Sequence, residues 1–190
     1  MTDPDVVAFL RRVLGGLDRV AVGMAYLGGA VLLLASVYIT LDVLGRRFVG
    51  VSSGATDEFG GYALAVGGMW ALAFALTTGS HVRIDVLLPH FPPRVRGLLN
   101  YAAMAAMAFF AGVVAFYTWK LAAESFTMDA RAMSFLRTPL VVPQGCLALG
   151  FTVLAAQASV IFLLGLAESL RHGRFAELAV LRVDDVTEGL

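Results

Sequence analysis

The sequence contains little of what catalytic, redox or metal sites need. It has a single cysteine, Cys146, so an internal disulfide, a cysteine-based zinc cluster and dithiol redox chemistry are excluded. Its three histidines, His81, His90 and His172, lie outside the long apolar runs, which argues against a haem held between membrane helices. No phosphate-binding loop and no nucleophile with a nearby base is present. We therefore expect neither an enzyme nor a bound cofactor or metal.

Charge is also scarce. Only 15% of the 190 residues are charged, and 14 basic residues balance 14 acidic ones, so nothing in the charge favours binding to nucleic acid. Hydrophobic residues make up 59% of the chain, against about 45–50% in soluble domains. The composition is that of a membrane protein.

The charged residues leave four uncharged runs, each at least 22 residues long: 20–41, 59–80, 97–119 and 138–167. About 20 apolar residues in a helix cross the roughly 30 Å hydrocarbon core of a bilayer. We therefore predict an all-α integral membrane protein with four transmembrane helices in a membrane domain over residues 20–172. The expected helices cover about 20–45, 57–80, 93–122 and 139–171.

Three flanking or connecting segments have a different character. Residues 1–19 carry apolar side chains at helical spacing, which predicts an amphipathic helix on the membrane surface or a solvated lead-in to the first span. Residues 81–96 mix apolar and charged residues and predict an interfacial arm along the membrane surface. Residues 173–190 form a tail. Nine basic residues in the inner segments against five in the outer ones place both termini in the cytoplasm.

Two acidic positions stand at the ends of predicted spans. Asp42 and Arg46 are four residues apart, so they share a helix face and can form an ion pair. A sharper hypothesis makes Asp42 an ion- or proton-coupling site. Glu58, beside Asp57, suits the positive end of the second helix dipole, and a partner-facing role is the alternative.

The second predicted span has two further features. Gly61, Ala65 and Gly68 share one helix face, where small residues allow another helix of this chain or of a partner to approach closely. Trp70 lies near the middle of the span. An indole at that depth needs a hydrogen-bond acceptor or a packed protein neighbour.

A set of motifs in this order resembles the small membrane subunit, the DctQ type, of the tripartite ATP-independent periplasmic (TRAP) transporters. The resemblance covers roughly residues 21–167. It is carried by the following residues: Leu41–Arg47 (LDVLGRR), Asp57, Glu58, Trp70, then Gly79, His81, Val82, Arg83, Ile84 and Asp85, and finally Pro139, Pro143 and Gly145.

The resemblance implies a non-catalytic subunit of the cell inner membrane. It would scaffold a large membrane subunit that performs sodium-coupled symport of a carboxylate. A periplasmic binding protein would deliver the substrate and touch the outer loops, 46–58 and 120–137. We expect the elbow at residues 81–85 to anchor the chain to lipid and to the large subunit. The candidate partner or lipid contacts are Asp42, Arg46, Glu58, Trp70, His81, Arg83 and Asp85.

Two other functions are compatible with the sequence. One is a stand-alone four-helix exporter of small molecules that uses Asp42 for coupling. The other is the membrane-anchor subunit of a redox complex that holds no haem. Co-purification separates the three, because each predicts a different partner or none.

Overall fold

The computed structural model describes residues 4–79, 91–134 and 136–172. This part of the chain forms four α-helices: α1 (Pro4–Phe48), α2 (Thr56–Thr77), α3 (Pro93–Thr127) and α4 (Val141–His172). All four are long and apolar enough to cross a membrane. The predicted all-α fold with four membrane helices is therefore confirmed. Most of the predicted interfacial arm, with His81, Arg83 and Asp85, and the tail from residue 173 lie outside the described residues.

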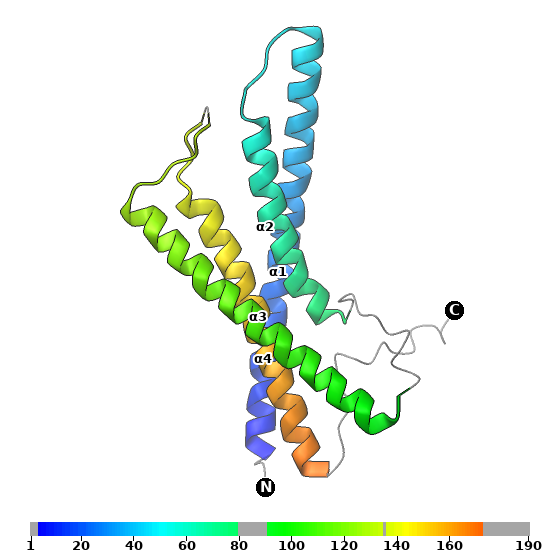
Figure 1. Ribbon diagram of the computed structural model, residues 1–190. Coiled ribbons are helices and arrows are strands. Elements are labelled where there is room, and N and C mark those ends of the chain that lie inside the picture. The colour runs from blue at the N-terminus through cyan, green and yellow to red at the C-terminus, as the bar shows by residue number, and fades with distance from the viewer. Residues whose placement is uncertain (1–3, 80–90, 135, 173–190) are drawn as a thin grey trace, which may run out of the picture.

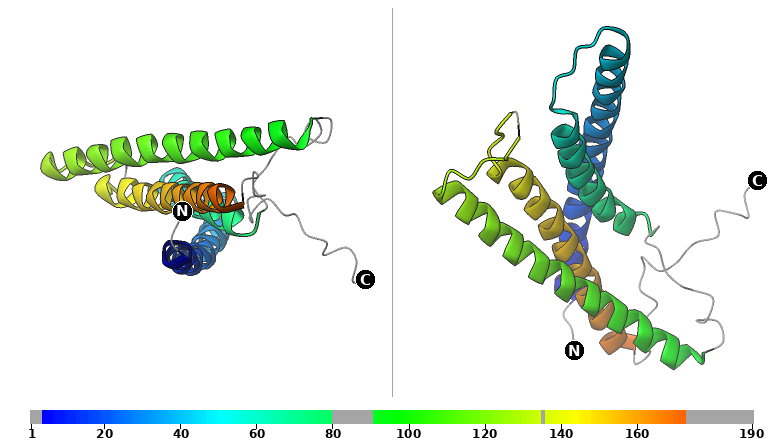
Figure 2. Two further views of the ribbon diagram at one scale, coloured as in Figure 1. Left: turned by 90° about the horizontal axis from the view of Figure 1, so that it is seen from below. Right: turned by 45° about the horizontal axis from the view of Figure 1, so that its top comes forward.

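The helices form two hairpins, α1–α2 and α3–α4, whose axes cross (Figure 1). Seen from below, α3 forms one outer layer, α4 lies in the middle, and α1 and α2 form the other side (Figure 2, left). Of the four helices, α4 packs against each of the other three. The way α4 is fastened to α1 and α2 therefore decides how the two hairpins are held together.

Helix α1 is a single helix of 45 residues, where the sequence predicts an amphipathic segment at 1–19 separate from a span at 20–45. The helix runs through both segments without a break, because no proline follows Pro4 within it and nothing else interrupts its hydrogen-bond ladder. Some of the apolar side chains of the first turns pack in a cluster against the last turns of α4, while Val6 and Phe9 are exposed. This cluster consists of Val7, Leu10, Leu14, Val160, Leu164 and Ala167.

The other helix ends shift by a few residues from the prediction. Helix α2 stops three residues early, because Gly79 takes the left-handed conformation at φ 67° that closes a helix. Helix α3 continues for five residues beyond 122, to Thr127. Pro143 lies in the first turn of α4, as predicted, whereas Pro139 precedes the helix and forms an isolated β-bridge with Arg131.

Helices α1 and α2 approach most closely at two glycines. A Cβ atom added to Gly28 would lie 3.1 Å from the Cα of Gly67, and one added to Gly67 would lie 2.5 Å from the side chain of Leu32. The predicted small-residue face is a different one, since a Cβ on Gly61 or Gly68 meets nothing within 4 Å. Inside this chain, α2 therefore packs on α1 through the face of Gly67. Of the two alternatives left open for Gly61, Ala65 and Gly68, the open space at both glycines does not support packing within this chain, and packing against a partner stays a prediction.

Candidate functional site

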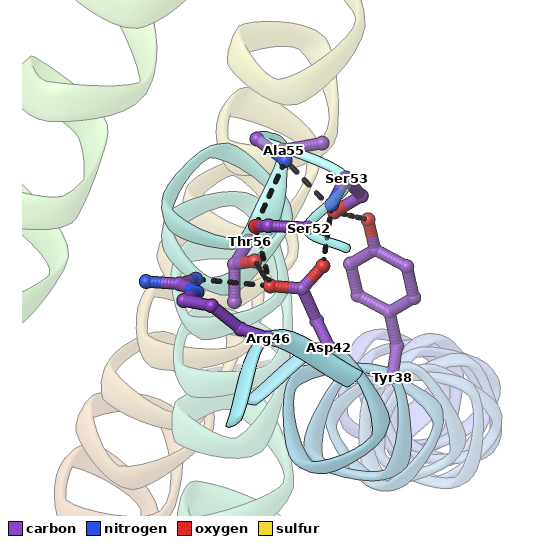
Figure 3. A network of polar contacts seen from close by, with 8 residues as sticks. Tyr38, Asp42, Arg46, Ser52, Ser53, Ala55 and Thr56 are labelled. Carbon is purple, nitrogen blue, oxygen red and sulfur yellow. Dashed lines mark hydrogen bonds and ion pairs between the residues drawn. The ribbon is translucent and has the colours of Figure 1, made fainter. Parts of the chain in front are cut away.

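The polar side chains gather at the two ends of α2 and at its middle. At the N-terminal end of α2, Asp42 of α1 faces the turn that leads into the helix, and its side chain is only 5% exposed. Its carboxylate accepts hydrogen bonds from the backbone N–H of Ser53 (2.6 Å) and the hydroxyls of Thr56 (2.9 Å) and Ser52 (3.1 Å). The guanidinium of Arg46 donates at 2.9 Å (Figure 3). The ion pair predicted from the four-residue spacing is present.

The contacts of Asp42 are all local in sequence. Its most distant partner, Thr56, is 14 residues away. The hydroxyl of Tyr38, one turn earlier on α1, donates to the hydroxyl of Ser53 at 2.6 Å and closes the same network (Figure 3). Gly50 and Gly54 supply the two left-handed conformations that the turn needs, at φ 75° and 67°. The carboxylate thus shapes the α1–α2 turn, and its acceptor positions are largely occupied by this chain.

Glu58 lies in the first turn of α2 and links the two hairpins. Its carboxylate accepts hydrogen bonds from the hydroxyl of Tyr62 (3.0 Å) and from the hydroxyl of Ser134 in the α3–α4 connection. Asp57, its neighbour, is exposed. Both acids stand at the helix start, where the helix dipole favours negative charge, but only Glu58 also reaches another part of the chain.

The α3–α4 connection has an ordered backbone that holds Ser134 in reach of Glu58. The N–H of Ala132 donates to the carbonyl of Thr138, and the N–H of Leu140 donates to the carbonyl of Ala130, each at 3.0 Å. Asp129, just before the first paired segment, and Arg137, just before the second, adopt left-handed conformations at φ 45° and 48°. Such conformations cost free energy in residues other than glycine, so the surrounding contacts hold the connection in place.

Trp70 forms the link at the middle of α2. Its indole N–H donates to the carbonyl oxygen of Cys146 on α4 at 2.9 Å. Gly150 of α4 allows the close approach, since a Cβ there would lie 3.0 Å from the indole and 3.2 Å from the Cβ of Met69. The expectation that this indole has a protein partner is confirmed, and the partner belongs to the same chain.

The C-terminal end of α2 holds a polar cluster that the sequence did not reveal. The side-chain amide of Gln157 on α4 donates to the carboxylate of Asp18 and to the hydroxyl of Thr77, each at 2.9 Å. The same hydroxyl lies 3.2 Å from the Asp18 carboxylate. Gln157 is fully buried. Its position in the long uncharged run 138–167 was the available signal, because a buried amide in a membrane span needs partners.

The two hairpins are therefore tied by hydrogen bonds at three depths. Glu58 binds Ser134 at the N-terminal end of α2, Trp70 binds the Cys146 carbonyl in the middle, and Gln157 binds Asp18 and Thr77 at the C-terminal end. Within residues 4–79, 91–134 and 136–172, no group of three or more His, Cys, Asp or Glu side chains could hold a metal ion. The geometry found in this part of the chain is suited to fixing helices relative to one another.

A comparison with protein families supplies an independent finding. The family model described as "Tripartite ATP-independent periplasmic transporters, DctQ component" matches residues 35–171, which is more than half of the chain. The matched region contains Asp42, Glu58, Trp70 and Gln157. No curated protein and no solved structure matches the sequence. The chain, a multi-pass membrane protein, belongs to the DctQ family, the small membrane component of TRAP transporters.

Proposed function

We propose that this chain is a fixed, non-catalytic scaffold for the large membrane subunit of a TRAP transporter. The complex would lie in a bacterial inner membrane, with both termini of this chain in the cytoplasm. It would take up a carboxylate, coupled to Na⁺ and delivered by a periplasmic binding protein. Membership of the family implies a hetero-complex with other TRAP components. The scaffold role, the coupling to Na⁺ and the carboxylate substrate go beyond family membership and form the proposal.

The observation that carries the proposal is the set of hydrogen bonds at three depths between the hairpins. A subunit that rearranged during transport would have to break them in each cycle, and buried polar groups left without partners are costly. The carboxylates of Asp42 and Glu58 are engaged within the chain. These contacts favour a rigid body over a transport site of its own and give no support to an exporter that uses Asp42.

We place the large subunit on the outward face of α2. Gly61 and Gly68 are exposed there, and a Cβ at either position meets open space. Ala65, between them on the same face, is half-buried. Membrane helices associate where small residues let two backbones approach closely. The face that fails to pack inside this chain is thus suited to a helix of the large subunit.

The first experiment is purification of the tagged chain from its native membranes in mild detergent, with mass spectrometry of the proteins that accompany it. The expected result is a stoichiometric large polytopic membrane protein. A chain that emerges alone, or with peripheral redox subunits, would contradict the scaffold role and favour one of the two alternatives.

The docking face is tested with Gly68→Leu. We expect the large subunit to be lost during purification, while the melting temperature of the chain stays unchanged because the new side chain points into open space. Gly23→Leu is the matched control, since Gly23 is an exposed glycine on α1 with open space around it. Retention of the large subunit by Gly68→Leu would place the interface elsewhere.

The elbow at His81, Arg83 and Asp85 remains a proposed anchor to lipid and to the large subunit. The double variant Arg83→Ala with Asp85→Ala is expected to reduce both assembly and uptake. Assembly and uptake at the level of the unmodified protein would remove this part of the proposal.

A further inference from the structure

The two ends of α2 fix the depth of α1 in the membrane. Thr77 at the inner end contacts Asp18, and Thr56 at the outer end contacts Asp42. Helix α2 has 22 residues, or about 33 Å at 1.5 Å per residue, close to the roughly 30 Å of a hydrocarbon core. Asp18 and Asp42 therefore mark the two boundaries of the hydrocarbon core on α1.

The outer end of α1 continues beyond this boundary. From Asp42 to Phe48 the helix rises by about 9 Å, and each headgroup layer is roughly 5–8 Å thick. Residues 43–51, here named the α1 tip, comprise the last turns of α1 and the start of the turn toward α2 (Figure 1). Arg46 and Arg47 of the α1 tip thus lie at the depth of the outer lipid headgroups.

The α1 tip combines positive charge with exposed apolar side chains. Arg46 is 60% exposed although it donates to Asp42, and its guanidinium keeps further donors. Arg47 is exposed and has no partner among the residues that the structure describes. No acidic residue belongs to the tip. Asp42, the residue before it, accepts its hydrogen bonds from the α1–α2 turn. Large apolar side chains are exposed beside the arginines: Val43, Leu44, Phe48, Val49 and Val51.

We propose that the α1 tip binds anionic phospholipid headgroups of the outer leaflet. Arg46 and Arg47 would hold lipid phosphates, which match a guanidinium in charge and hydrogen-bonding geometry. Phe48, Val49 and Val51 would contact the lipid at the level of the headgroups. A soluble acidic protein would satisfy the arginines as well, but Arg46 and Arg47 lie at the depth of the headgroups, where lipid is already present, and Phe48 beside them is 79% exposed. The choice of the outer leaflet rests on the proposed orientation with both termini in the cytoplasm, but the inference does not depend on the scaffold role, since it concerns this chain and the bilayer alone.

The test needs one reactive cysteine at a chosen position, and Cys146 is the single native cysteine that has to be replaced first. On a Cys146→Ala background, Val49→Cys is labelled with a bimane fluorophore and the full chain is placed in vesicles of phosphatidylcholine, with or without an equal part of phosphatidylglycerol. Quenching by acrylamide, which is neutral, reports access from water. Leu33→Cys, exposed in the middle of α1, is the control within the membrane, and Asp129→Cys in the α3–α4 connection is the control exposed to water.

We expect the label at position 49 to be shielded in phosphatidylglycerol vesicles and more accessible in phosphatidylcholine alone. Arg47→Gln should reduce this difference, since the loss of one arginine near an anionic surface weakens binding about fivefold while Arg46 remains. Arg131→Gln, an exposed arginine outside the tip, should preserve it. A label as accessible as that at position 129 in both vesicles would overturn the proposal and leave the tip for a soluble partner. Equal shielding in both vesicles would also overturn it, because the headgroup charge would not be recognised.

Discussion

Two carboxylates of helix α1, Asp18 and Asp42, lie beside opposite ends of α2 and take their hydrogen-bond donors from different parts of the chain. Asp42 takes its donors from its own helix, from the turn that follows and from the first residue of α2, at most 14 residues away. Asp18 takes its donors from α2 and α4, 59 and 139 residues away. The first carboxylate shapes a turn within one hairpin, whereas the second joins the two hairpins. Similar chemistry on one helix thus serves local structure at one end and long-range assembly at the other.

The comparison also separates what is visible in a sequence from what is not. A carboxylate that acts locally leaves a short-range spacing, such as the four residues from Asp42 to Arg46. A carboxylate that acts over long range leaves only isolated polar residues in distant segments. Asp18 and Gln157 each have an ordinary appearance until the fold brings them to within 2.9 Å.

The largest expected effect comes from removing the local carboxylate. Asp42→Ala takes the acceptor from the backbone of Ser53 and from three side chains, so the α1–α2 turn loses its order. We expect the melting temperature in detergent to fall by about 5 °C or more. Asp57→Ala, an exposed acid on the first turn of α2, should change it by about 1 °C or less. Equal melting temperatures for the two variants would mean that the network does not hold the turn.

The next effect tests the long-range end. Gln157→Leu removes two hydrogen bonds and leaves the Asp18 carboxylate with Thr77 alone. We expect a loss of about 1–2 kcal/mol in the free energy of unfolding, partly offset because the buried side-chain oxygen of Gln157 has no partner among the described residues. Ser159→Ala on the same helix is the control, since that hydroxyl bonds only within α4. In the double variant of Gln157→Leu with Asp42→Ala, the two decreases in melting temperature should add, because the two sites share no partner. Strong coupling between them would contradict the division into local and long-range roles.

A smaller effect is expected between the two carboxylates, where α1 and α2 touch. Gly28→Ala places a methyl group 3.1 Å from the Cα of Gly67 and should cost about 1 kcal/mol. Gly68→Ala adds the same methyl group in open space and should be neutral or slightly stabilising, because alanine favours helix. Chemical denaturation in micelles distinguishes them. The reverse order of stability would mean that the other face of α2 packs on α1.

The smallest effect is expected at Trp70, between the two ends. Trp70→Phe removes a single hydrogen bond to the Cys146 carbonyl and keeps most of the packing against α4. Interhelical hydrogen bonds in membranes average about 0.6 kcal/mol, so the free energy of unfolding should fall by about that amount. A loss above about 2 kcal/mol would show that the middle, rather than the ends, fastens the hairpins.

Much of the fold could be predicted from the sequence because spans of uncharged residues and local spacings are one-dimensional signals. The four helices and the Asp42–Arg46 pair belong to this group, as does the need of Trp70 for a partner. The length of α1 was missed because a change from charged to apolar residues marks a membrane boundary and not a helix end. Residues 4–48 cross that boundary without a break.

Local signals of this kind could not predict which helix faces pack together, nor the polar cluster of Asp18, Thr77 and Gln157. Helix α2 has glycines on more than one face, and Gly67 and Gly68 are neighbours in sequence that point in different directions. Only the position of α1 decides which of them is buried. The partners of Asp18 are set by how the two hairpins cross, and a single sequence carries no record of that crossing.

The difference in separation between the partners of the two carboxylates also sets an order in time. Ribosomes add roughly 5–20 residues per second. The 14 residues from Asp42 to Thr56 are therefore made in about 1–3 s, whereas the 139 residues from Asp18 to Gln157 take roughly 7–28 s. During that interval the α1–α2 hairpin can already have its finished turn, while Asp18 still lacks its contact with α4. The first hairpin is thus able to enter the membrane as a completed unit, and the arrival of Gln157 closes the assembly.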